Sequence, residues 1–560
     1  MNDGFLSARI YAYSTWQYFE RAIARLFIHR GHKNVELVGG TGDKGADVIV
    51  SNYEGDFVIQ VKYSKTNKAL SVDIVGDVVR AMDYYKIKKG LCMSNRQLGP
   101  GQITKMKTFQ SSGYDIGSIT SRTLLTIFDE LPKWTKDDRA PRRYQQECIA
   151  QLKTSYDTGD KKGLISLATG MGKTYVGCSF LKWLYEKNEH INVLVLAHTN
   201  TLLEQFERST WSFLPKTVPT YQLTGSEKPV FTGGMLFSTF QSFPKWFEDH
   251  DETIFDIVIV DEAHHSPADT YQEVLNWINP RYMLGLTATP YRMDRRSVTH
   301  IFGEPLVYYD VARGIKNGFL SQVDYRIKTD KLSKEMDLPS LIAKKSQEGY
   351  TVKQLNKKVF IEHRDDKMCE VFIDFWKSYS RDRGIIFCNS VVHALSIEKL
   401  LRNSYGIPIW SLTNKNTGSS SDHKKENARR LREFRNGGVK ILTAFDMLNE
   451  GVDVPDVDII AFMRVTHSRT YFLQQLGRGL RLKQDNKKLL ILDFVADLRQ
   501  VRAIRNTALG YSRDGTIEHL DLGENFTIEF TDYETGEFLD LVTQDEELAF
   551  ADLDHELTGF

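Results

Sequence analysis

A glycine-rich turn in the first third of the chain has the composition of a phosphate-binding loop. The apolar run 164–168 precedes this turn, and residues 175–183 read as a helix. Backbone N–H groups in such a turn and the positive end of the following helix attract phosphate. The Lys173 ammonium would reach the β- and γ-phosphates, and the Thr174 hydroxyl would ligate Mg²⁺. The predicted nucleotide-binding residues of the turn are Thr169, Gly170, Gly172, Lys173 and Thr174.

Two adjacent carboxylates follow a second apolar run. Residues 255–260 lead directly into Asp261 and Glu262. A carboxylate at a strand tip can bind Mg²⁺, and its neighbour can orient and deprotonate the water that attacks the γ-phosphate. We therefore expect Asp261 to be a metal ligand and Glu262 to be the general base of nucleotide hydrolysis. His264 could couple this site to a neighbouring domain.

A separate set of polar residues lies in the first 130 residues. Asp47 falls in the strand-like segment 46–50, and Gln60 and Lys62 fall in the segment 57–62. Gln60 and Lys62 are two residues apart, so they share one face of their strand. Two adjacent antiparallel strands with this pattern can hold Mg²⁺ and activate water against a phosphodiester. Lys62 would stabilise the pentavalent phosphate or position the attacking water.

Buried parallel strands must position the nucleotide residues. Short apolar runs that end in polar residues recur at 192–199, 237–242, 285–290, 384–390 and 440–446. Such runs are typical of parallel strands covered on both faces, and α/β folds bind ligands at the carboxyl ends of these strands. Thr199, Thr239 and Gln241 stand at these exits. They are candidates for nucleic-acid backbone contacts, or they simply begin the next helices.

The order of these motifs resembles the core of superfamily 2 DEAH-box helicases over residues 140–500. The motifs that carry the resemblance are the loop 168–174, the acidic motif 261–264 and the segment 474–481, which fits QxxGRxxR. The helicase form of the loop requires no glycine at Leu167, where the full P-loop pattern has one. The resemblance implies two RecA-like domains with ATP in the cleft between them and single-stranded nucleic acid across both.

The helicase resemblance also assigns residues outside the two acidic and glycine-rich motifs. Gln145 would read the adenine edge, because an amide both donates and accepts hydrogen bonds. Arg478 and Arg481 would stabilise charge on the transferring phosphoryl group once the domains close. Gly451 and Asp453 are expected at the nucleotide.

The N-terminal set resembles the catalytic domain of the Mrr-type restriction endonucleases, a branch of the PD-(D/E)xK nucleases. The matching segments are 19–20, 42–47 and 60–62. The resemblance implies that Asp47 is a metal ligand, that Lys62 is the catalytic lysine, and that Glu20 adds a carboxylate from a helix over 14–29. It also places Gln60 where Glu or Asp usually binds the metal. Because a neutral ligand binds metal more weakly, a domain that binds DNA without cutting it is the alternative.

Composition fits a cytoplasmic DNA-binding protein. The chain of 560 residues has no apolar run long enough to span a membrane and no secretory leader pattern. Its five cysteines form no CxxC pair, which favours a reducing cytoplasm over a disulfide framework. The formal net charge is zero, but fifteen Asp and Glu and no Lys or Arg follow Arg513, so residues 1–513 carry +15. A basic body suits a polyanionic partner.

Two charged segments have open interpretations. Residues 415–435 form a basic stretch that could track phosphates or be a solvated helix face. The acidic tail alternates apolar and acidic residues around 526–530, which predicts a hairpin that shields a basic surface.

These observations predict an α/β protein with a restriction-endonuclease-like domain, two RecA-like domains and a short acidic extension. The expected ranges are nuclease 1–130, linker 131–141, first RecA-like domain 142–312, insert 313–375, second RecA-like domain 376–505 and acidic tail 506–560. We expect an ATP- and Mg²⁺-dependent DNA helicase or translocase coupled to an endonuclease, acting on duplex or single-stranded DNA in restriction or anti-phage defence. Partner proteins of such a system are possible. The alternatives are a repair or remodelling helicase whose N-terminal domain only binds DNA, and a non-catalytic nucleotide-gated binding protein.

Overall fold

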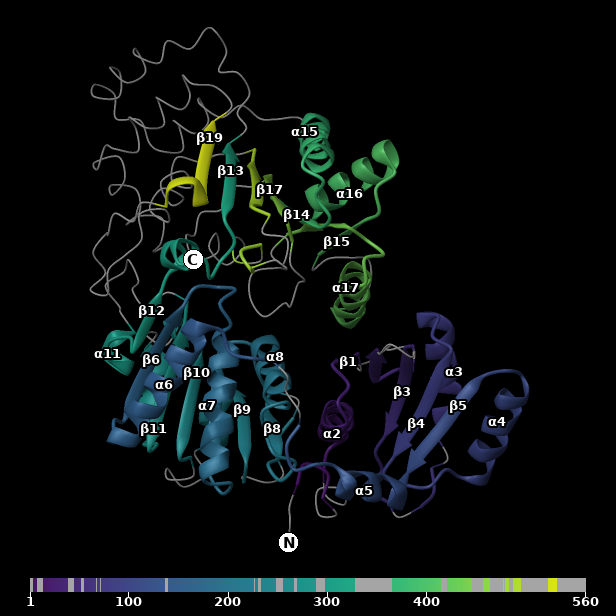
Figure 1. Ribbon diagram of the computed structural model, residues 1–560. Coiled ribbons are helices and arrows are strands. Elements are labelled where there is room, and N and C mark those ends of the chain that lie inside the picture. The colour runs from purple at the N-terminus through teal and green to yellow at the C-terminus, as the bar shows by residue number, and fades with distance from the viewer. Residues whose placement is uncertain are drawn as a thin grey trace, which may run out of the picture. The chain divides into compact units, whose positions relative to one another are not determined.

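The chain forms three sheets with flanking helices in the computed structural model (Figure 1). Its contacts divide into two compact units, residues 1–166 with 172–308 and residues 167–171 with 309–560. The predicted α/β class is confirmed. The structure describes residues 4–7, 14–38, 45–51, 55–66, 68–70, 72–135, 139–225, 227–229, 233–247, 255–265, 269–288, 298–327, 365–413, 420–445, 457–463, 477, 479–482, 487–494 and 522–530.

The first sheet contains five strands from the N-terminal quarter of the chain. They are β1 (Asn34–Leu37), β2 (Val48–Ser51), β3 (Phe57–Lys62), β4 (Lys89–Ser94) and β5 (Asp115–Thr120), in that order across the sheet. β1, β2 and β3 are antiparallel, whereas β3, β4 and β5 are parallel. The predicted antiparallel pairing of the strands around Asp47 and Gln60 is therefore confirmed. The helices are α2 (Trp16–His29), α3 (Ile74–Tyr85), α4 (Pro100–Ser111) and α5 (Ser121–Glu130).

Alternation along these strands sends apolar side chains to both faces of the first sheet. Val48, Val50 and Ile59 join a core with α2, whereas Ile49 and Val58 join a second core with α3. The α2 helix begins where the Thr15 hydroxyl accepts a hydrogen bond from the Tyr18 N–H at 3.1 Å. A sheet covered on both faces by helices holds the polar residues near its strand ends in fixed positions.

The second sheet belongs to the same unit and has the strand order β12-β6-β11-β10-β7-β9-β8. Its strands are β6 (Lys162–Leu167), β7 (Val193–Ala197), β8 (Thr220–Leu223), β9 (Met235–Thr239), β10 (Ile257–Asp261), β11 (Tyr282–Thr287) and β12 (Val307–Tyr309). The pairings of β6 with β11, β11 with β10, β10 with β7, β7 with β9 and β9 with β8 are all parallel. The accompanying helices are α6 (Arg143–Thr158), α7 (Lys173–Lys187), α8 (Asn200–Thr210), α9 (Phe243–Phe247), η1 (Ala263–His265), α10 (Asp269–Trp277) and α11 (Thr299–Phe302).

The third sheet lies in the second unit and has the order β15-β16-β14-β17-β18-β13-β19. Every adjacent pair in it is parallel. The strands are β13 (Val323–Ile327), β14 (Gly384–Cys388), β15 (Ile409–Leu412), β16 (Ile441–Ala444), β17 (Ile459–Met463), β18 (Leu489–Asp493) and β19 (Phe526–Phe530). The remaining elements are α12 (Val311–Lys316), α15 (Asp365–Ser378), α16 (Val391–Tyr405), α17 (Ser420–Arg435) and η2 (Gly523–Asn525).

Two strands of the third sheet come from segments that were not expected to join it. β13 falls in the range expected for the insert, yet it pairs with β18 from Val323↔Leu489 to Ile327↔Asp493. The tail segment 526–530 was expected in a hairpin, but the pairing that the structure describes for β19 is a parallel one with β13. Its alternating pattern indicated a strand with one covered face, but the partner strand lies some 200 residues away and no local signal names it. The six domain ranges themselves stay a prediction.

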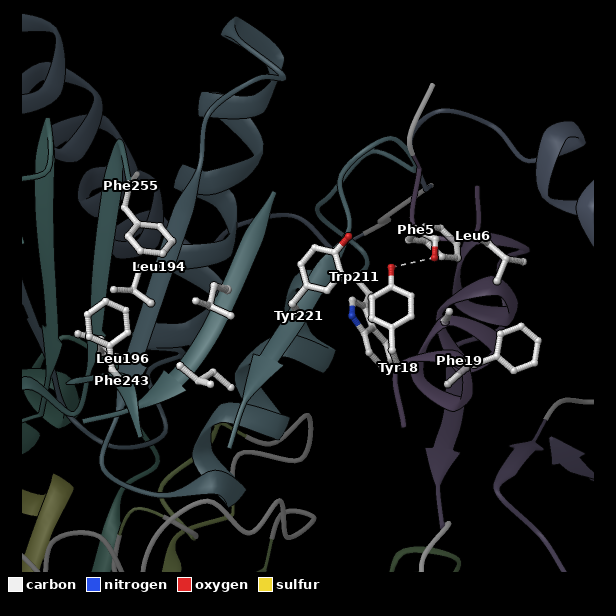
Figure 2. Packing of buried hydrophobic residues seen from close by; sticks show 14 of the residues in the cluster. Phe5, Leu6, Tyr18, Phe19, Leu194, Leu196, Trp211, Tyr221, Phe243 and Phe255 are labelled. Carbon is white, nitrogen blue, oxygen red and sulfur yellow. Dashed lines mark hydrogen bonds between the residues drawn. The ribbon is translucent and has the colours of Figure 1, made fainter. Parts of the chain in front are cut away.

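A single apolar core connects the first two sheets. It contains Val48 and Ile59 of the first sheet, Leu194 and Tyr221 of the second, and Phe19 of α2. Tyr18 of α2 stacks on Tyr221 with ring centroids 5.2 Å apart (Figure 2). The first sheet and the second sheet therefore share buried side chains through α2.

Among the described residues no helix is both long enough and apolar enough to cross a membrane. All five cysteines are buried, and none of them forms a disulfide.

Candidate nucleotide and nuclease sites

Three neighbouring strands of the second sheet end beside one another at the predicted nucleotide site. In the register of these strands Ser166 of β6 is opposite Thr287 of β11, and Leu286 of β11 is opposite Asp261 of β10. The glycine-rich turn follows β6, and Glu262 follows β10. Parallel pairing therefore brings the turn and the acidic pair to the same edge, although nearly 90 residues separate them in sequence.

The turn closes with a glycine that its geometry requires. Gly172 has φ +81°, in the left-handed region, and it is the N-cap of α7, which begins at Lys173. A Cβ at Gly172 would lie 2.7 Å from Nε2 of Gln145. The predicted adenine-reading residue is thus packed against the turn. Its Oε1 accepts a hydrogen bond from the Arg142 N–H at 2.9 Å and so caps the start of α6.

Lys173 and Glu262 meet at this edge of the sheet. Lys173 Nζ lies 3.6 Å from Glu262 Oε1, and both side chains are largely buried. His264 Nδ1 lies 3.4 Å from Glu262 Oε2 and 3.4 Å from Thr287 Oγ1. Glu262 has φ +48°, a backbone conformation that costs a residue with a side chain about 1–3 kcal/mol and is common at functional sites. The geometry holds the predicted base between a lysine and a histidine.

Asp261 is the last residue of β10 and is buried. Burial, followed by the adjacent Glu262 carboxylate, raises the pKa of Asp261 to about 7, although Lys173 opposes the shift. Two carboxylates side by side cannot both stay ionised cheaply in a dry site. A divalent cation would relieve this repulsion. The available donors, a carboxylate of Asp261 and the hydroxyl of Thr174, are both oxygens, which fits Mg²⁺.

The structure describes only one of the four residues of the second RecA-like domain that were predicted to act on ATP. Gly451, Asp453 and Arg478 lie outside the described residues. Arg481 is described in the second unit, where its carbonyl oxygen accepts a hydrogen bond from Ser321 Oγ at 2.7 Å. Their roles at the nucleotide stay predictions.

The first sheet gathers Asp47 and Gln60 at one position. Each side chain is only 2% exposed. Asp47 Oδ2 accepts a hydrogen bond from the Val61 N–H at 2.6 Å and also contacts Gln60 Nε2. Gln60 Oε1 has no hydrogen-bond partner among the described residues. A buried amide oxygen without a partner beside a buried carboxylate is a site that a divalent cation fits.

The metal-binding capacity of this position rests on an unusual pair. Among the described residues no three His, Cys, Asp or Glu side chains gather as a metal site. The cation would therefore rest on the Asp47 carboxylate and the Gln60 amide, with Glu20 as a further candidate. Glu20 is half-buried on α2, and the neighbouring Phe19 packs against Tyr63 with ring centroids 5.5 Å apart.

Lys62 has a partner that the sequence did not indicate. Its Nζ lies 3.3 Å from Oδ2 of Asp77 on α3, and Asp77 also pairs with Arg80. A Cβ at Gly45, which has φ +91°, would lie 2.1 Å from the Asp77 carbonyl oxygen. Glycine thus lets the segment leading to Asp47 approach the start of α3. Asp77 occupies an ordinary helix position, so no local pattern could have singled it out.

Two other expectations find structural roles. Thr199 Oγ1 accepts from the Leu202 N–H at 3.3 Å and Thr239 Oγ1 accepts from the Ser242 N–H at 3.1 Å, so both hydroxyls cap turns at the strand exits. Gln241 Nε2 donates to the Tyr271 hydroxyl at 2.8 Å. The contacts of Thr199 and Thr239 therefore fit residues that begin a helix or a turn, and nucleic-acid contacts by these residues stay a prediction.

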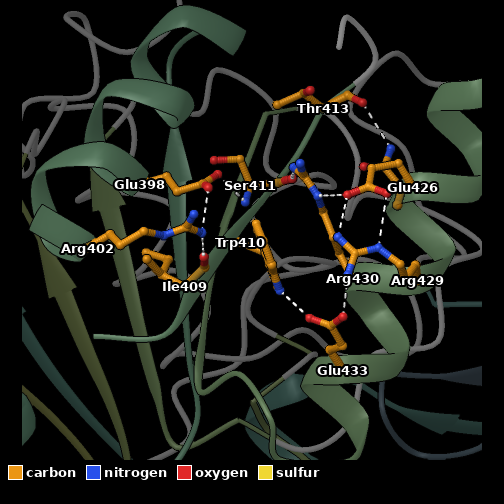
Figure 3. Close-up of polar contacts among 11 residues, drawn as sticks. Glu398, Arg402, Ile409, Trp410, Ser411, Thr413, Glu426, Arg429, Arg430 and Glu433 are labelled. Atoms are coloured by element: carbon orange, nitrogen blue, oxygen red, sulfur yellow. Dashed lines mark hydrogen bonds and ion pairs between the residues drawn. The ribbon is translucent and has the colours of Figure 1, made fainter. Parts of the chain in front are cut away.

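The basic helix α17 turns part of its charge inward (Figure 3). Arg429 and Arg430 both pair with Glu426, and Arg402, Arg429 and Arg430 all lie within 5.2 Å of the Trp410 ring centre. Trp410 Nε1 donates to Glu433 at 2.6 Å. These contacts tie α17 to β15 and α16, so Arg429 and Arg430 are engaged in packing within the second unit.

The fold and the sites define a class of protein. Its members combine parallel RecA-like sheets, which carry a P-loop and an acidic motif, with a mixed sheet that carries Asp, Gln and Lys at one position. Three family models match successive parts of the chain. They describe a restriction endonuclease over residues 12–111, the res subunit of type III restriction enzymes over 138–292 and the helicase conserved C-terminal domain over 363–483. These matches confirm both resemblances inferred from the motifs.

Individual proteins agree with the family models. The chain is 26% identical over 401 residues to the type I restriction enzyme EcoAI endonuclease subunit of Escherichia coli, covering 65% of this chain and 48% of that protein. It is 23% identical to the putative ATP-dependent helicase IRC3 of Saccharomyces cerevisiae, covering 63% of this chain and 51% of that protein. The chain thus spans about half the length of these curated relatives.

One solved structure shows the fold over nearly the whole chain. It is the ATP-dependent type ISP restriction-modification enzyme LlaBIII bound to DNA, with a TM-score of 0.52 at 13% identity. The alignment covers 94% of this chain and 42% of that one.

Proposed function

We propose that the chain is an ATP-dependent DNA translocase or helicase coupled to a Mg²⁺-dependent DNA endonuclease, serving restriction or anti-phage defence. The observation that carries the motor half is the meeting of Lys173, Asp261 and Glu262 where β6 and β10 end. The similarity to restriction and helicase proteins supports this combination.

The motor residues divide the work of ATP hydrolysis. The backbone of Gly170 to Thr174 cradles the phosphates, Lys173 neutralises their charge, and Gln145 binds the adenine. Thr174 and Asp261 would hold Mg²⁺, which would supply positive charge against the charge that develops on the phosphates. Glu262 orients the attacking water and accepts its proton, and His264 fixes the carboxylate from the opposite side to Lys173.

The remaining motor residues act from the second RecA-like domain. Arg478 and Arg481 stabilise charge on the transferring phosphoryl group, and Gly451 and Asp453 complete the nucleotide site. Alternate grip on the DNA phosphates during the ATP cycle moves the strand.

The nuclease residues form a smaller set. Asp47 and Gln60, with Glu20, would hold a divalent cation, which lowers the pKa of a bound water and neutralises charge on the phosphodiester. Lys62 binds the scissile phosphate or positions the water, and Asp77 holds the Lys62 ammonium before DNA arrives. DNA is the partner, and proteins of a defence system are further partners. The five buried cysteines form no disulfide, which agrees with a cytoplasmic location.

A cleavage assay tests the proposal and its alternative together. Supercoiled, linear, single-stranded and forked DNA are incubated with Mg²⁺ or Mn²⁺, with and without ATP. Cutting that needs the metal supports the endonuclease. DNA-stimulated ATP hydrolysis without any cutting favours a repair or remodelling helicase with a DNA-binding N-terminal domain, which the neutral ligand Gln60 would explain. Absence of both activities overturns the proposal.

A further inference from the structure

Helix α2 belongs to two domains at once. Phe19 and Phe27 pack toward the first sheet, where their rings lie 5.5 Å from those of Tyr63 and Phe57. Tyr18 stacks on Tyr221 of the second sheet, and its hydroxyl donates a hydrogen bond to the carbonyl of Phe5, which precedes α2, at 2.9 Å (Figure 2). Helix α2, which carries the candidate nuclease residue Glu20, therefore contacts both the first and the second sheet.

A buried ionic cluster links α2 to α8 and to the segment that follows β8. Arg21 donates from Nη1 and Nη2 to the two carboxylate oxygens of Glu227 at 2.6 and 2.8 Å, and its Nε lies 3.2 Å from Glu207 Oε2. The three side chains are 10%, 6% and 1% exposed, in the order Arg21, Glu227, Glu207. Burial alone would lower the pKa of Arg21, but Glu207 and Glu227 outweigh it and raise the pKa.

The motor side supplies two further hydrogen bonds to the buried carboxylate of Glu207. Glu207 accepts from Thr220 Oγ1 and from Gln222 Nε2, both at 2.6 Å. Buried charges are tolerated when their hydrogen bonds are complete, and removing one partner is far more costly than the pair is stabilising. The cluster therefore specifies one docking geometry for α2.

Further contacts extend this attachment along the interface. Arg25 donates to the carbonyls of Val218 at 2.7 Å and Pro215 at 2.9 Å, and its guanidinium lies 4.3 Å from the centre of the Phe5 ring. Burial lowers the pKa of Arg25 to about 10, so it stays charged at neutral pH. Lys216 of the motor donates to the carbonyls that end α5, those of Phe128, Asp129 and Leu131. These carbonyls would otherwise lack partners.

We propose that the N-terminal domain and the first RecA-like domain form one rigid body joined through α2, with Arg21 as the positioning residue of the nuclease site. At the end of the described residues that follow α5, Thr135 Oγ1 donates a hydrogen bond to the Ser212 carbonyl and adds a further contact between the two domains. The nuclease therefore moves with the motor domain that carries Lys173. The consequence of this rigid connection for DNA cutting rests on the proposed function. The rigid connection itself does not depend on the proposed function.

Native-state hydrogen exchange of the full chain at increasing urea tests the rigid body without any catalytic activity. The best-protected amides of β3 and β4 are compared with those of β7 and β10. In the wild type both sets should exchange through one opening, with rates within about threefold and the same urea dependence. Arg21→Gln should split them into two openings, and the amides of β3 and β4 should exchange about a hundredfold faster.

Matched variants make the outcome decisive. Arg122→Gln removes an exposed arginine of α5 and should behave as the wild type. Arg21→Lys keeps the charge but loses the paired guanidinium donors to Glu227, so the exchange rates of the two sets of amides should differ less than in Arg21→Gln. It replaces Arg21→Gln if that protein fails to fold. Two separate openings in the wild type, or one opening in both Arg21 variants, overturn the proposal.

A cleavage experiment tests the consequence. On DNA with a protein roadblock that stalls the motor, the wild type should cut in a narrow window at a fixed distance from the block. Arg21→Gln should widen that window, with ATP turnover within about twofold of the wild type, and Arg21→Lys should partly restore it. Equal windows in wild type and Arg21→Gln contradict the positioning role. Complete absence of cutting in the wild type counts against the proposed nuclease function, and hydrogen exchange still decides the rigid body.

Discussion

The proposed nucleotide site and the proposed nuclease site each contain a carboxylate at one end of a strand, but its surroundings differ between the two. Asp261 stands beside a second carboxylate, Glu262; the Lys173 ammonium partly compensates their charge, and His264 Nδ1 lies 3.4 Å from Glu262 Oε2. Asp47 instead accepts hydrogen bonds from the Val61 N–H and the Gln60 amide. In the first site two neighbouring carboxylates repel each other. In the second site the single carboxylate of Asp47 has neutral hydrogen-bond donors, and the Gln60 Oε1 beside it has no partner among the described residues.

This difference indicates how strongly each site depends on metal and on its neighbours. A site with repelling carboxylates gains much from Mg²⁺, because the cation removes the repulsion. A site that pairs one carboxylate with an amide has less charge to offer and binds the cation more weakly. We therefore expect the motor to work at lower Mg²⁺ concentrations than the nuclease.

Loss of the P-loop lysine should have the largest effect. Lys173→Ala removes the ammonium beside Glu262 and the phosphates, so ATP turnover should fall at least about 100-fold. Lys187→Ala on the same helix, whose exposed ammonium pairs with Asp157, is the matched control and should keep normal turnover. Steady-state phosphate release measures both. Near-normal turnover in Lys173→Ala would remove this site from the mechanism.

Loss of the nuclease carboxylate should separate the two sites. Asp47→Asn keeps the size of the side chain but removes its charge, so Mg²⁺-dependent nicking should fall about 100-fold while ATP turnover is unchanged. Asp115→Asn, at an exposed position of the same sheet, should leave both activities intact. Gel assays of supercoiled DNA and phosphate release provide the two readouts. A parallel loss of ATP turnover in Asp47→Asn would contradict independent sites.

The repulsion at Asp261 should appear as a pH dependence. Because burial and Glu262 raise the pKa of Asp261 to about 7, the nucleotide-free protein should lose stability as pH rises through that value. Binding of Mg²⁺ with ADP requires the ionised carboxylate, so it should release a proton below about pH 7. Calorimetry in buffers of different ionisation enthalpy measures that proton. Glu262→Gln should lower the pKa of Asp261 and move the proton release to lower pH. If the pH dependence of proton release does not move, Glu262 is not a cause of the raised pKa of Asp261.

The smallest effect is expected at the partner of the nuclease lysine. Asp77→Asn frees the Lys62 ammonium, so nicking should fall about tenfold, as for groups that orient a functional residue. The free energy of unfolding should change by less than about 1 kcal/mol, because both side chains are partly exposed. Asp83→Asn, exposed on the same helix, is the control. Nicking equal to that of the wild type would show that Asp77 does not contribute to cleavage.

Much of the nucleotide site was predictable because its signals are local. Gly172, Lys173 and Thr174 are consecutive, and Asp261 and Glu262 follow a run that only a buried strand explains. The antiparallel strands that carry Asp47 and Gln60 were predictable for the same reason, since alternation and a short turn connect them. The contact of Lys62 with Asp77 was not, because it depends on how α3 packs against β3.

By itself, the sequence determined the fold class, the motifs and the order of their domains, since each depends on residues near one another in the chain. Only the tertiary structure decided that β19 joins the sheet of β13 and that Arg21 meets Glu227, 206 residues away. Parallel pairing and buried ion pairs between remote segments leave no periodicity in the chain. A lone arginine on an amphipathic helix reads as solvent-exposed until the partner that buries it is known.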